Sequence, residues 1–582
     1  MNLHVEGRQL RNLILVVAIW PLAVSCGGNS SSSGAAIPPP PVDARTLLTV
    51  DQLLGVAGPG VVHNNYFQPI GDLVAVSNNL CGTIQFAEAR MDTTHFDADW
   101  RGSGLTLFPT FELPVAVSGD WLVPLERDII LSGSGGGTGR SVWNVIANPG
   151  RVWQEADDAG YSRAAFPITF TDNYVGHARN ALATFVFDGA GISSVAVQIT
   201  QETAPVAEHE RVDFSVLVPV TWDPVCPLDA NAQIAAFDTE RARRLPVRPW
   251  SDLPNAATAK ATVQAGYADT DFSMLALLMD GELFISPVAT RSGPHPFPEW
   301  MRHGVYSVTK TMGLGVSMLY LAQRYGDGVF DELITDHVPE LAAHPGWQGV
   351  TFHHTLNMVT GTVGAERGAA IHPYIMARSA AEKIDAIEDL PDAPPAPGAQ
   401  FAYYSTHSFV LSYAMDKLVA AREGAGTHYW ELVRRDVLEP IGVAHLPISR
   451  SIESGGDPGS PIMGWGSYPD VDAAAKVAQL LQDDGIFNGQ QLLSRTKTRE
   501  AMRRTSAQAY PTGNPLEQYL HSVWTVRTNT GNCTVDVPMM SGYGGNHILM
   551  LPSGLSVVRF MDADDYEVDP AARAVEGYRS SC

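Results

Sequence analysis

Ser307 and Lys310 are spaced so that their side chains can react together. They stand three positions apart, at the head of an apolar stretch that continues to Leu321. In a helix, positions i and i+3 lie on one face, so the lysine ammonium can reach the serine hydroxyl. A serine hydroxyl is a poor nucleophile until a neighbouring group accepts its proton, and a lysine desolvated by apolar residues can accept it. The pair therefore predicts a serine nucleophile with a lysine base, the pairing of a serine hydrolase.

A second pair has the same spacing. Ser494 and Lys497 stand beside the charged stretch 499–504. This composition predicts a solvated surface helix with Ser494 at its N-cap, where the lysine keeps its proton. Ser307 instead heads a run with few charges before Arg324, as expected of a helix buried in a large domain. We therefore expect Ser307, rather than Ser494, to be the functional copy.

The composition indicates an acidic, folded protein. A chain of 582 residues predicts about two to four domains. Its hydrophobic content of 45% is enough to build full cores, which excludes a disordered or fibrous chain. The formal net charge of -24 argues against binding nucleic acid or an anionic membrane through a basic surface.

The N-terminus has the pattern of an export signal over residues 1–25. Arg8 and Arg11 precede an apolar run, 13–24, that is too short to span a membrane, since a spanning helix needs about 20 residues. Residues 22–28 resemble the lipobox of bacterial lipoproteins. That resemblance implies cleavage before Cys26 and acylation of this cysteine, with stable anchoring through several acyl chains. The alternative is an ordinary secretory signal with a coincidental cysteine.

Residues 26–45 are rich in Ser, Gly and Pro and predict a tether between the anchor and the folded part. The expected location is outside the cytoplasm, on the periplasmic or outer-membrane side of a Gram-negative bacterium. An even number of cysteines remains after Cys26, and in an exported chain it favours disulfide bonds. Four cysteines permit three pairings. We expect Cys81 with Cys226 and Cys533 with Cys582, because each pair then stays within one domain.

The chain changes character near residue 235. Residues 46–235 contain no lysine and carry short apolar or alternating runs, such as 182–187 and 194–199, separated by glycine-rich turns. This pattern predicts a β-rich domain, a sandwich or a barrel-like sheet, without a catalytic constellation. It is expected to be structural, the alternative being a module that presents substrate.

Residues 236–582 mix strands and helices. The segment 272–285 predicts a hairpin around Asp280 and Gly281, 471–483 predicts an amphipathic helix, and 542–559 predicts two further strands. Strands at both ends with helices between them predict one antiparallel sheet built from both termini, with an inserted helical lobe.

The order of these pieces resembles the serine β-lactamase and penicillin-binding-protein-like family, including class C β-lactamases, family VIII-type esterases and nylon-oligomer hydrolases. The resemblance covers about residues 260–565. It rests on the 272–285 hairpin, on Ser307 to Lys310 and on the segments 356–361, 397–405 and 542–546. It implies an α+β fold, with a β-lactamase/transpeptidase-like catalytic domain over 236–582 preceded by the β-rich domain.

The family's second motif is a tyrosine two residues before an Asn or a Ser. Tyr403 with Ser405 fits this spacing best, and Tyr404 is the alternative. By the resemblance, a phenol held partly ionised beside Lys310 relays a proton to the leaving group.

The third motif departs from the family. Members that recognise penicillin carry Lys-Thr-Gly or His-Thr-Gly beside the site, where the cation binds a substrate carboxylate. Here Met540-Ser541-Gly542 has no lysine, and His547 stands a few residues too late. This departure argues against β-lactams or D-Ala-D-Ala peptides as natural substrates.

The resemblance implies acyl transfer through Ser307, on small or oligomeric esters or amides. Backbone N–H groups of Ser307 and of the strand near Gly545 and Asn546 are expected to hold the oxyanion, with Ser405 beside them. No metal or organic cofactor is required, and the adjacent histidines His353 and His354 lack the spacing of a metalloprotease motif. Two alternatives remain, namely a DD-peptidase or β-lactamase, and a non-catalytic surface lipoprotein that binds ligands.

Overall fold

The computed structural model describes residues 45–91, 106–133, 140–172, 174–203, 214–391 and 396–582. The predicted signal peptide, Cys26 and nearly all of the predicted tether lie outside these ranges. Arg45, the last tether residue, is described and pairs with Glu155 at 2.6 Å, so it belongs to the folded part. Within the described ranges, no helix is both long and apolar enough to cross a membrane.

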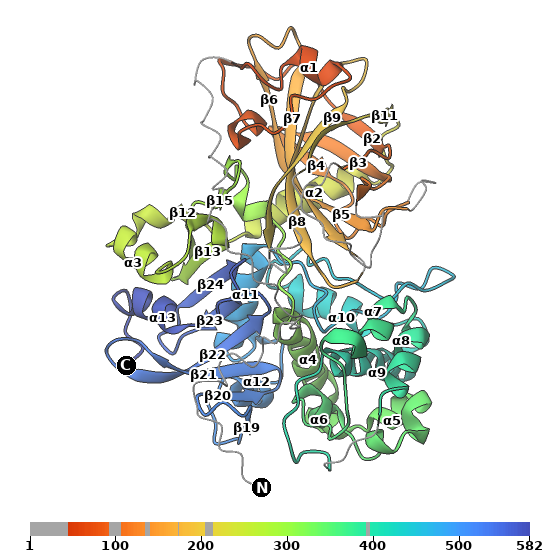
Figure 1. Ribbon diagram of the computed structural model, residues 1–582, viewed down its shortest axis with the longest axis vertical. Helices are drawn as coiled ribbons and strands as arrows, with labels where there is room; N and C mark the ends of the chain where they lie inside the picture. Colours follow the sequence, from red (N-terminus) through yellow and green to blue (C-terminus); the bar gives the residue numbers. More distant parts are fainter. Residues whose placement is uncertain (1–44, 92–105, 134–139, 173, 204–213, 392–395) are drawn as a thin grey trace, which may run out of the picture.

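The N-terminal part is built on an eleven-stranded antiparallel sheet, the upper part of the molecule in Figure 1. Its strands are β1 (Leu73–Val74), β2 (Cys81–Phe86), β3 (Phe111–Ser118), β4 (Trp121–Pro124), β5 (Trp143–Ala147), β6 (Gly150–Glu155), β7 (Ser162–Asp172), β8 (Ala178–Phe187), β9 (Val195–Thr203), β10 (Ser215–Val218) and β11 (Val220–Asp223). They run in the order β10-β9-β8-β7-β6-β4-β3-β2-β11, with β1 paired to β6 and β5 to β7. A short helix, α1 (Val50–Leu54), precedes them.

One continuous segment joins the two ends of this sheet. β10 pairs with β9, and after Pro219 the chain continues as β11, which pairs with β2 at the other end. The sheet is therefore barrel-like, one of the two forms that the sequence predicts. Its interior is filled by a cluster of buried apolar side chains that includes Phe108 and Phe170.

The C-terminal part contains a nine-stranded sheet drawn from both ends of that part. The strands are β12 (Val247–Pro249), β13 (Phe272–Met279), β14 (Glu282–Ile285), β19 (Tyr510–Pro511), β20 (Glu517–Leu520), β21 (Val523–Asn529), β22 (Thr534–Gly542), β23 (Asn546–Met550) and β24 (Ser556–Met561). Their order is β12-β14-β13-β24-β23-β22-β21-β20-β19. This confirms an α+β fold with an additional β-rich domain. One detail differs from the expectation, because β12 pairs with β14 in parallel.

The predicted hairpin is present between β13 and β14. Asp280 and Gly281 both have positive φ, 53° and 79°, as a two-residue hairpin turn requires. Two smaller hairpins, β15 (Ala289–Thr290) with β16 (Gly293–Pro294) and β17 (Ile486–Phe487) with β18 (Gln490–Gln491), lie outside the main sheet.

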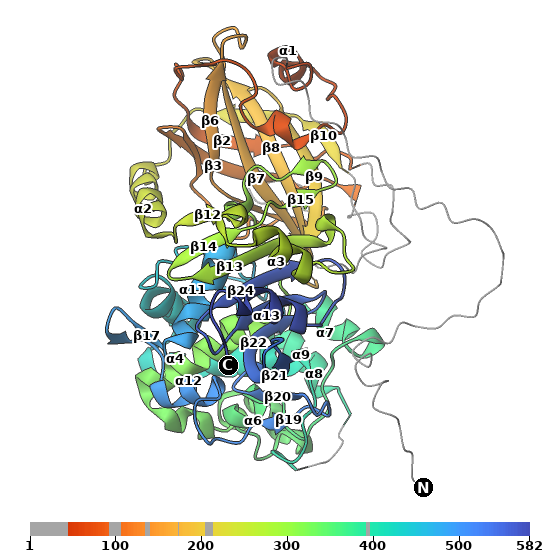
Figure 2. The ribbon, with the colours of Figure 1, turned by 90° about the vertical axis from the view of Figure 1, so that its left-hand side faces the viewer.

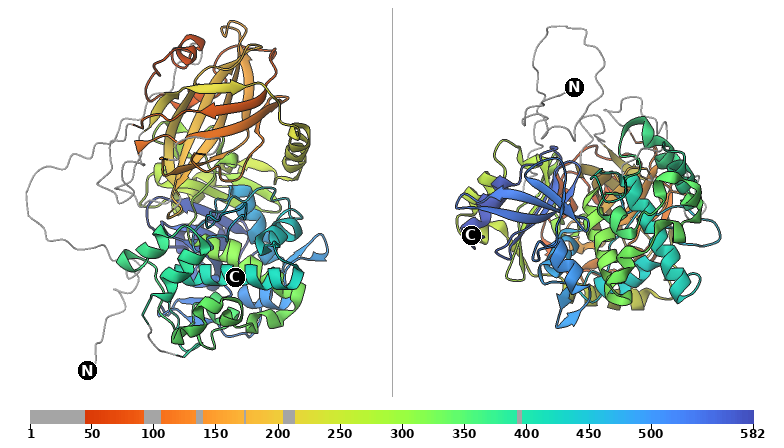
Figure 3. Two further views of the ribbon diagram at one scale, coloured as in Figure 1. Left: turned by 90° about the vertical axis from the view of Figure 1, so that its right-hand side faces the viewer. Right: turned by 90° about the horizontal axis from the view of Figure 1, so that it is seen from below.

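Helices cover both faces of the nine-stranded sheet. Figures 2 and 3 show α3 (Ala256–Val263) and α13 (Asp569–Glu576) together on one side, with the helical lobe on the other. The lobe and its neighbouring helices are α4 (Val316–Tyr325), α5 (Ile334–His337), α6 (Phe352–Leu356), α7 (His372–Met376), α8 (Ala380–Glu388), α9 (Ser405–Glu423), α10 (Tyr429–Val433) and α12 (Arg495–Ala501).

The predicted amphipathic helix is α11 (Val471–Gln482), which packs against β23 and β24. Its polar face is not solvated, because Asp472 and Lys476 are only 4% and 6% exposed. These two side chains pair with each other at 2.7 Å. Lys476 also donates to the Arg243 carbonyl, at the end of α2 (Ala230–Arg243), the helix that links the two parts.

A buried charged network joins the β-rich part to the C-terminal part. Arg302, fully buried, donates from Nε to the Oδ1 of Asn148 at 3.0 Å and lies 3.6 Å from Asp470. Arg244 pairs with the same carboxylate at 2.9 Å. Burial opposes the ionisation of Asp470, but Arg244 and Arg302 outweigh it and hold the pKa of this carboxyl below its usual value. The network fixes the segment that leads into Ser307.

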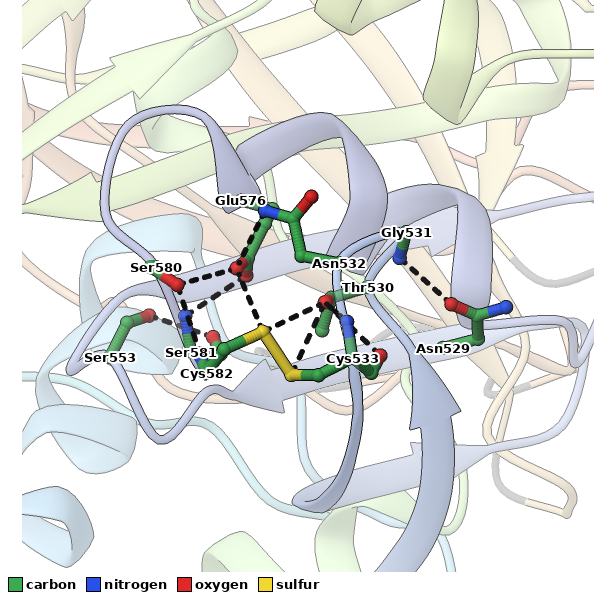
Figure 4. The surroundings of a disulfide bond; sticks show 10 residues. All are labelled: Asn529, Thr530, Gly531, Asn532, Cys533, Ser553, Glu576, Ser580, Ser581 and Cys582. Atoms are coloured by element: carbon green, nitrogen blue, oxygen red, sulfur yellow. Dashed lines mark hydrogen bonds between the residues drawn. A yellow bond between two sulfur atoms is a disulfide. The ribbon is translucent and has the colours of Figure 1, made fainter.

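Two disulfide bonds join the cysteines in the pairing expected from the sequence. Cys81–Cys226 lies in the β-rich part, and Cys533–Cys582 ties the turn between β21 and β22 to the last residue of the chain. Figure 4 shows the second bond beside Thr530, whose hydroxyl lies 3.8 and 3.7 Å from the two sulfur atoms.

Candidate active site

Ser307 lies in a turn at the start of the predicted helix. The turn leads into a π-helical segment, η7 (Lys310–Gly315), and then into α4. Tyr306, just before Ser307, has a φ of 47°, a conformation that non-glycine residues seldom adopt and that is often found at functional sites. The chain thus turns sharply at the residue that precedes the expected nucleophile.

Lys310 is the centre of a buried polar cluster. Its Nζ donates to Ser307 Oγ at 2.9 Å, to Ser405 Oγ at 2.8 Å and to the Gly464 carbonyl at 3.0 Å. These contacts use all three donors of an ammonium. The side chain is 1% exposed, and burial lowers its pKa to about 8, although the charge of Glu366 acts in the opposite direction. Near neutral pH a fraction of this lysine is therefore neutral and able to accept a proton.

The structure distinguishes the two candidate tyrosines. Lys310 Nζ lies 4.5 Å from the ring centroid of Tyr403, whose side chain also interacts with Ser307. The ring of Tyr404 instead packs edge-on against His407, at 5.2 Å between centroids. Burial raises the pKa of Tyr403 well above its ordinary value. This direction favours the neutral phenol, a form that can donate a proton.

Two members of the cluster were not found from the sequence. Glu366 accepts a hydrogen bond from the Ser405 backbone N–H, and burial raises the pKa of this carboxyl, while Lys310 lowers it. Glu366 stands five residues after the 356–361 segment. Its closeness to that segment is the one feature of the sequence that could have indicated a place in the site. Gly464 acts through its carbonyl, which no sequence pattern reveals.

The glycine-rich strand contributes through Gly542 rather than through Gly545 or Asn546. A Cβ on Gly542 would lie 2.1 Å from the Val305 carbonyl and 3.2 Å from the Ser307 nitrogen, so only glycine allows this approach. A Cβ on Gly545 would instead meet the Asp565 backbone. The Asn546 side chain donates to the Tyr543 carbonyl at 2.6 Å and accepts from a backbone N–H on β24, so it holds two strands together.

The backbone N–H of Ser307 is positioned to act as an oxyanion donor. Within the described ranges it has no hydrogen-bond acceptor, and its nitrogen lies close to Gly542 at the end of β22. A free N–H at the nucleophile, beside a strand whose edge comes this close, is the arrangement that an oxyanion hole requires.

The second serine–lysine pair has a structural role, as the sequence indicates. Ser494 caps α12 and donates to Asp327 Oδ1 at 2.6 Å. Lys497 Nζ pairs with Glu500 at 3.0 Å instead of contacting the Ser494 hydroxyl.

The histidines outside the cluster also hold structure together. His547 pairs with Ser541 across the sheet, but it is fully buried and its Nδ1 accepts from Arg559 at 2.9 Å. Burial lowers its pKa well below the ordinary value, so it does not replace the cation of the third motif. His353 Nε2 lies 3.0 Å from the Tyr510 hydroxyl, and His354 caps α6 together with Thr351.

The β-rich part reaches the candidate site through the β7–β8 connection. Gly176, in this connection, has a φ of 80°, and a Cβ there would lie 3.0 Å from both Cδ1 and the carbonyl of Trp465. Trp465 directly follows Gly464, whose carbonyl binds Lys310. His177 lies 6.0 Å from the Tyr306 ring, centroid to centroid. The N-terminal part therefore contacts the residues next to Gly464 and to Ser307.

Three solved structures are similar to part of this chain. A family VIII carboxylesterase has 17% sequence identity and a TM-score of 0.41, over 56% of this chain and 96% of that one. A penicillin-binding-protein homologue from Caulobacter crescentus has 16% identity and a TM-score of 0.41, over 56% and 97%. A D-stereospecific amidohydrolase from Streptomyces sp. has 16% identity and a TM-score of 0.39, over 56% and 98%.

No protein-family model matches the sequence, and no curated protein matches it either. The geometry of the site, rather than these likenesses, therefore carries the functional argument.

Proposed function

We propose that this protein is a serine hydrolase that cleaves an ester or amide bond through an acyl-enzyme on Ser307. The observation that carries the proposal is the 2.9 Å contact between Lys310 Nζ and Ser307 Oγ, made by a lysine whose pKa burial lowers to about 8. A lysine with this pKa is a competent base near neutral pH. The rival role, a binding protein without catalysis, needs neither this contact nor a buried lysine.

The proposed reaction has two steps. Ser307 Oγ attacks the carbonyl carbon while Lys310 accepts its proton, and the oxyanion is held by the Ser307 N–H and by backbone at the end of β22. Neutral Tyr403 donates a proton to the leaving group as the bond to it breaks, and Lys310 restores that proton. Water then attacks the acyl carbon and gives a proton to Lys310, and Lys310 passes this proton to Ser307 Oγ as the bond between Ser307 and the acyl carbon breaks.

The surroundings favour substrates that carry no carboxylate near the reacting bond. Met540 stands where penicillin-recognising relatives carry a lysine, and the charge of Glu366 acts on Lys310. A carboxylate repels an anionic substrate and offers no binding partner for it. We therefore place a small or oligomeric neutral ester or amide ahead of β-lactams and D-Ala-D-Ala peptides. A lipid anchor at Cys26, on the periplasmic or outer-membrane side, is part of the same proposal.

The test compares one reactive serine with a matched control. The soluble chain from residue 27 onward is assayed on p-nitrophenyl acetate and butyrate beside Ser307→Ala and Ser494→Ala. We expect Ser307→Ala to lose at least about a thousandfold in kcat/KM, and Ser494→Ala to keep activity within about threefold. Equal activity in the wild type and in Ser307→Ala would exclude Ser307 as the nucleophile.

A second measurement separates the two enzyme alternatives. A fluorescent penicillin is incubated with the wild type, and covalent labelling is read on a denaturing gel. We expect no label at Ser307 under conditions where the acetate ester turns over. Stoichiometric labelling that Ser307→Ala abolishes would instead favour the penicillin-recognising class.

A further inference from the structure

Four aromatic residues form a continuous surface beside the candidate active site. Their ring centroids lie 5.0 to 6.3 Å apart in every pairwise contact. We call this surface the aromatic wall; its members are Phe401, Tyr403, Tyr519 and Trp524. Tyr519 is fully buried and supports the others, whereas Phe401, Tyr403 and Trp524 each remain partly exposed.

The aromatic wall begins at the reacting groups. The Tyr403 ring lies 4.5 Å from Lys310 Nζ on one side and 5.4 Å from the Trp524 ring on the other. Because Tyr403 donates its proton to the leaving group in the proposed reaction, the atoms just beyond it belong to the leaving-group side of the substrate. Trp524 and Phe401 extend the surface in that direction.

This side of the site is apolar where relatives that recognise penicillin carry a cation. Trp524 is the direct partner of Met539 in the β21–β22 pairing, and Met540 follows Met539. Met539 and Met540 are both buried, so the exposed part of this side is the aromatic rings, on which a planar apolar group packs well. They offer nothing that neutralises a carboxylate.

We propose that the aromatic wall binds the leaving group of the substrate, and that this group is an uncharged aromatic alcohol or amine. The inference rests on the proposed function. In the step concerned, the Ser307 Oγ–carbon bond forms, and the carbon–oxygen or carbon–nitrogen bond to the aromatic group breaks. The leaving atom takes the Tyr403 proton, and Lys310 passes to Tyr403 the proton it accepted from Ser307. No oxidant or further reactant is involved.

The test holds the acyl group constant and varies only the leaving group. Benzyl acetate, 2-methoxyethyl acetate and 4-(acetoxymethyl)benzoate release alcohols of similar reactivity, and hydrolysis is followed by titration at constant pH. We expect the wild type to prefer benzyl over methoxyethyl acetate by at least about tenfold in kcat/KM, since packing one ring on such a surface is typically worth this much. The benzoate ester, which carries the same ring with an added carboxylate, should fall below benzyl acetate by a similar factor.

Variants assign the preference to the wall. Trp524→Ala should reduce the benzyl-to-methoxyethyl ratio in kcat/KM to below about threefold. Phe401→Leu should reduce the same ratio by a smaller factor. Because Phe401 lies in a loop, this variant tests the aromatic wall even if Trp524→Ala, in a strand, fails to fold. Trp222→Ala removes a partly exposed tryptophan from β11 and should leave the ratio unchanged.

The outcomes separate the two proposals. Ser307-dependent hydrolysis of benzyl and methoxyethyl acetate at equal rates would overturn the role of the aromatic wall and leave the proposed function intact. Ethyl phenylacetate and ethyl acetate differ only in the acyl group. If Trp524→Ala lowers turnover of the first relative to the second, while the benzyl-to-methoxyethyl ratio stays constant, the aromatic wall binds the acyl group. That result would also overturn the leaving-group role and leave the proposed function intact. If no ester shows Ser307-dependent turnover, the proposed function fails and this inference falls with it.

Discussion

Arg302 and Asn148 form a buried hydrogen bond, 3.0 Å from Nε to Oδ1, that crosses from the C-terminal part to the β-rich part five residues before Ser307. Arg302 is fully buried and its charge is balanced by Asp470. A hydrogen bond to a charged, buried partner contributes more than one between neutral groups. The contact therefore couples the position of the β-rich part to the segment that carries the nucleophile.

Asn148→Ala is expected to destabilise this junction by about 1.5–3 kcal/mol, because it removes a hydrogen bond to a charged group and leaves the guanidinium less well satisfied. Urea unfolding followed by tryptophan fluorescence measures the loss. Asn231→Ala, at an exposed site on α2, is the matched control and should change the midpoint little. Equal midpoints for the two variants would show that the bond does not stabilise the junction.

The close contact at Gly176 predicts that the β-rich part affects catalysis. Gly176→Ala places a methyl group 3.0 Å from Trp465, beside the Gly464 carbonyl that binds Lys310. Displacing that carbonyl should misplace the base and lower kcat/KM for p-nitrophenyl acetate by about tenfold or more. The measurement is steady-state kinetics at a temperature where the variant remains folded.

Gly160→Ala isolates the packing effect. Gly160 has a similar backbone conformation, with a φ of 91° against 80° for Gly176, but a Cβ there meets nothing within 4 Å. Both substitutions carry the cost of a positive φ, about 1 kcal/mol. Gly160→Ala should therefore lose some stability and keep its activity. Equal losses of activity in both variants would assign the effect to backbone strain and not to the contact with Trp465.

The Cys533–Cys582 disulfide is expected to affect stability and not turnover. The two cysteines are 49 residues apart, and closing such a loop stabilises the folded state by up to about 4 kcal/mol in the chain-entropy view. The bond holds α13, which packs into a core cluster distinct from the one that surrounds Ser307. The Cys533→Ser/Cys582→Ser double variant should therefore inactivate at lower temperature, while kcat/KM at 25 °C stays within about twofold of the wild type. A large loss of activity at 25 °C would contradict this division.

Local patterns in the sequence were enough to predict much of the site. The spacing of Ser307 and Lys310, the Asp280–Gly281 turn and the Tyr403–Ser405 spacing each depend on residues close together in the chain. The choice between Tyr403 and Tyr404 depends on which ring faces Lys310, and that follows only from the packing of Tyr404 on His407.

These local patterns do not predict contacts between segments that are far apart in the sequence. Glu366 and Gly464 meet Lys310 only after the helical lobe folds, and Gly176 reaches Trp465 across nearly 300 residues. The strand glycine that approaches Ser307 is Gly542, because the register of β22 and β23 turns Asn546 toward the β24 backbone. Register is a property of paired strands, so a single sequence segment does not reveal it.

The pKa of Lys310 predicts how activity depends on pH. Lys310 must be neutral to accept the Ser307 proton, and its pKa is lowered to about 8 by burial. Below this pH the ammonium form dominates and the neutral fraction falls, so kcat/KM for p-nitrophenyl acetate should rise with pH and level off above about 8. The pH profile of the wild type, corrected for spontaneous hydrolysis, measures this rising part of the profile, the rising limb, directly.

Glu366→Gln tests whether the limb belongs to Lys310. The Glu366 charge stabilises the ammonium and raises the pKa of Lys310, so its removal should move the limb to lower pH. Glutamine can still accept the Ser405 N–H, which keeps the local geometry. Glu388→Gln, which neutralises an exposed carboxylate on α8, should leave the limb in place. An unmoved limb in Glu366→Gln, or a shift to higher pH, would mean that another group limits the reaction, because a carboxylate beside the base can only favour its protonated form.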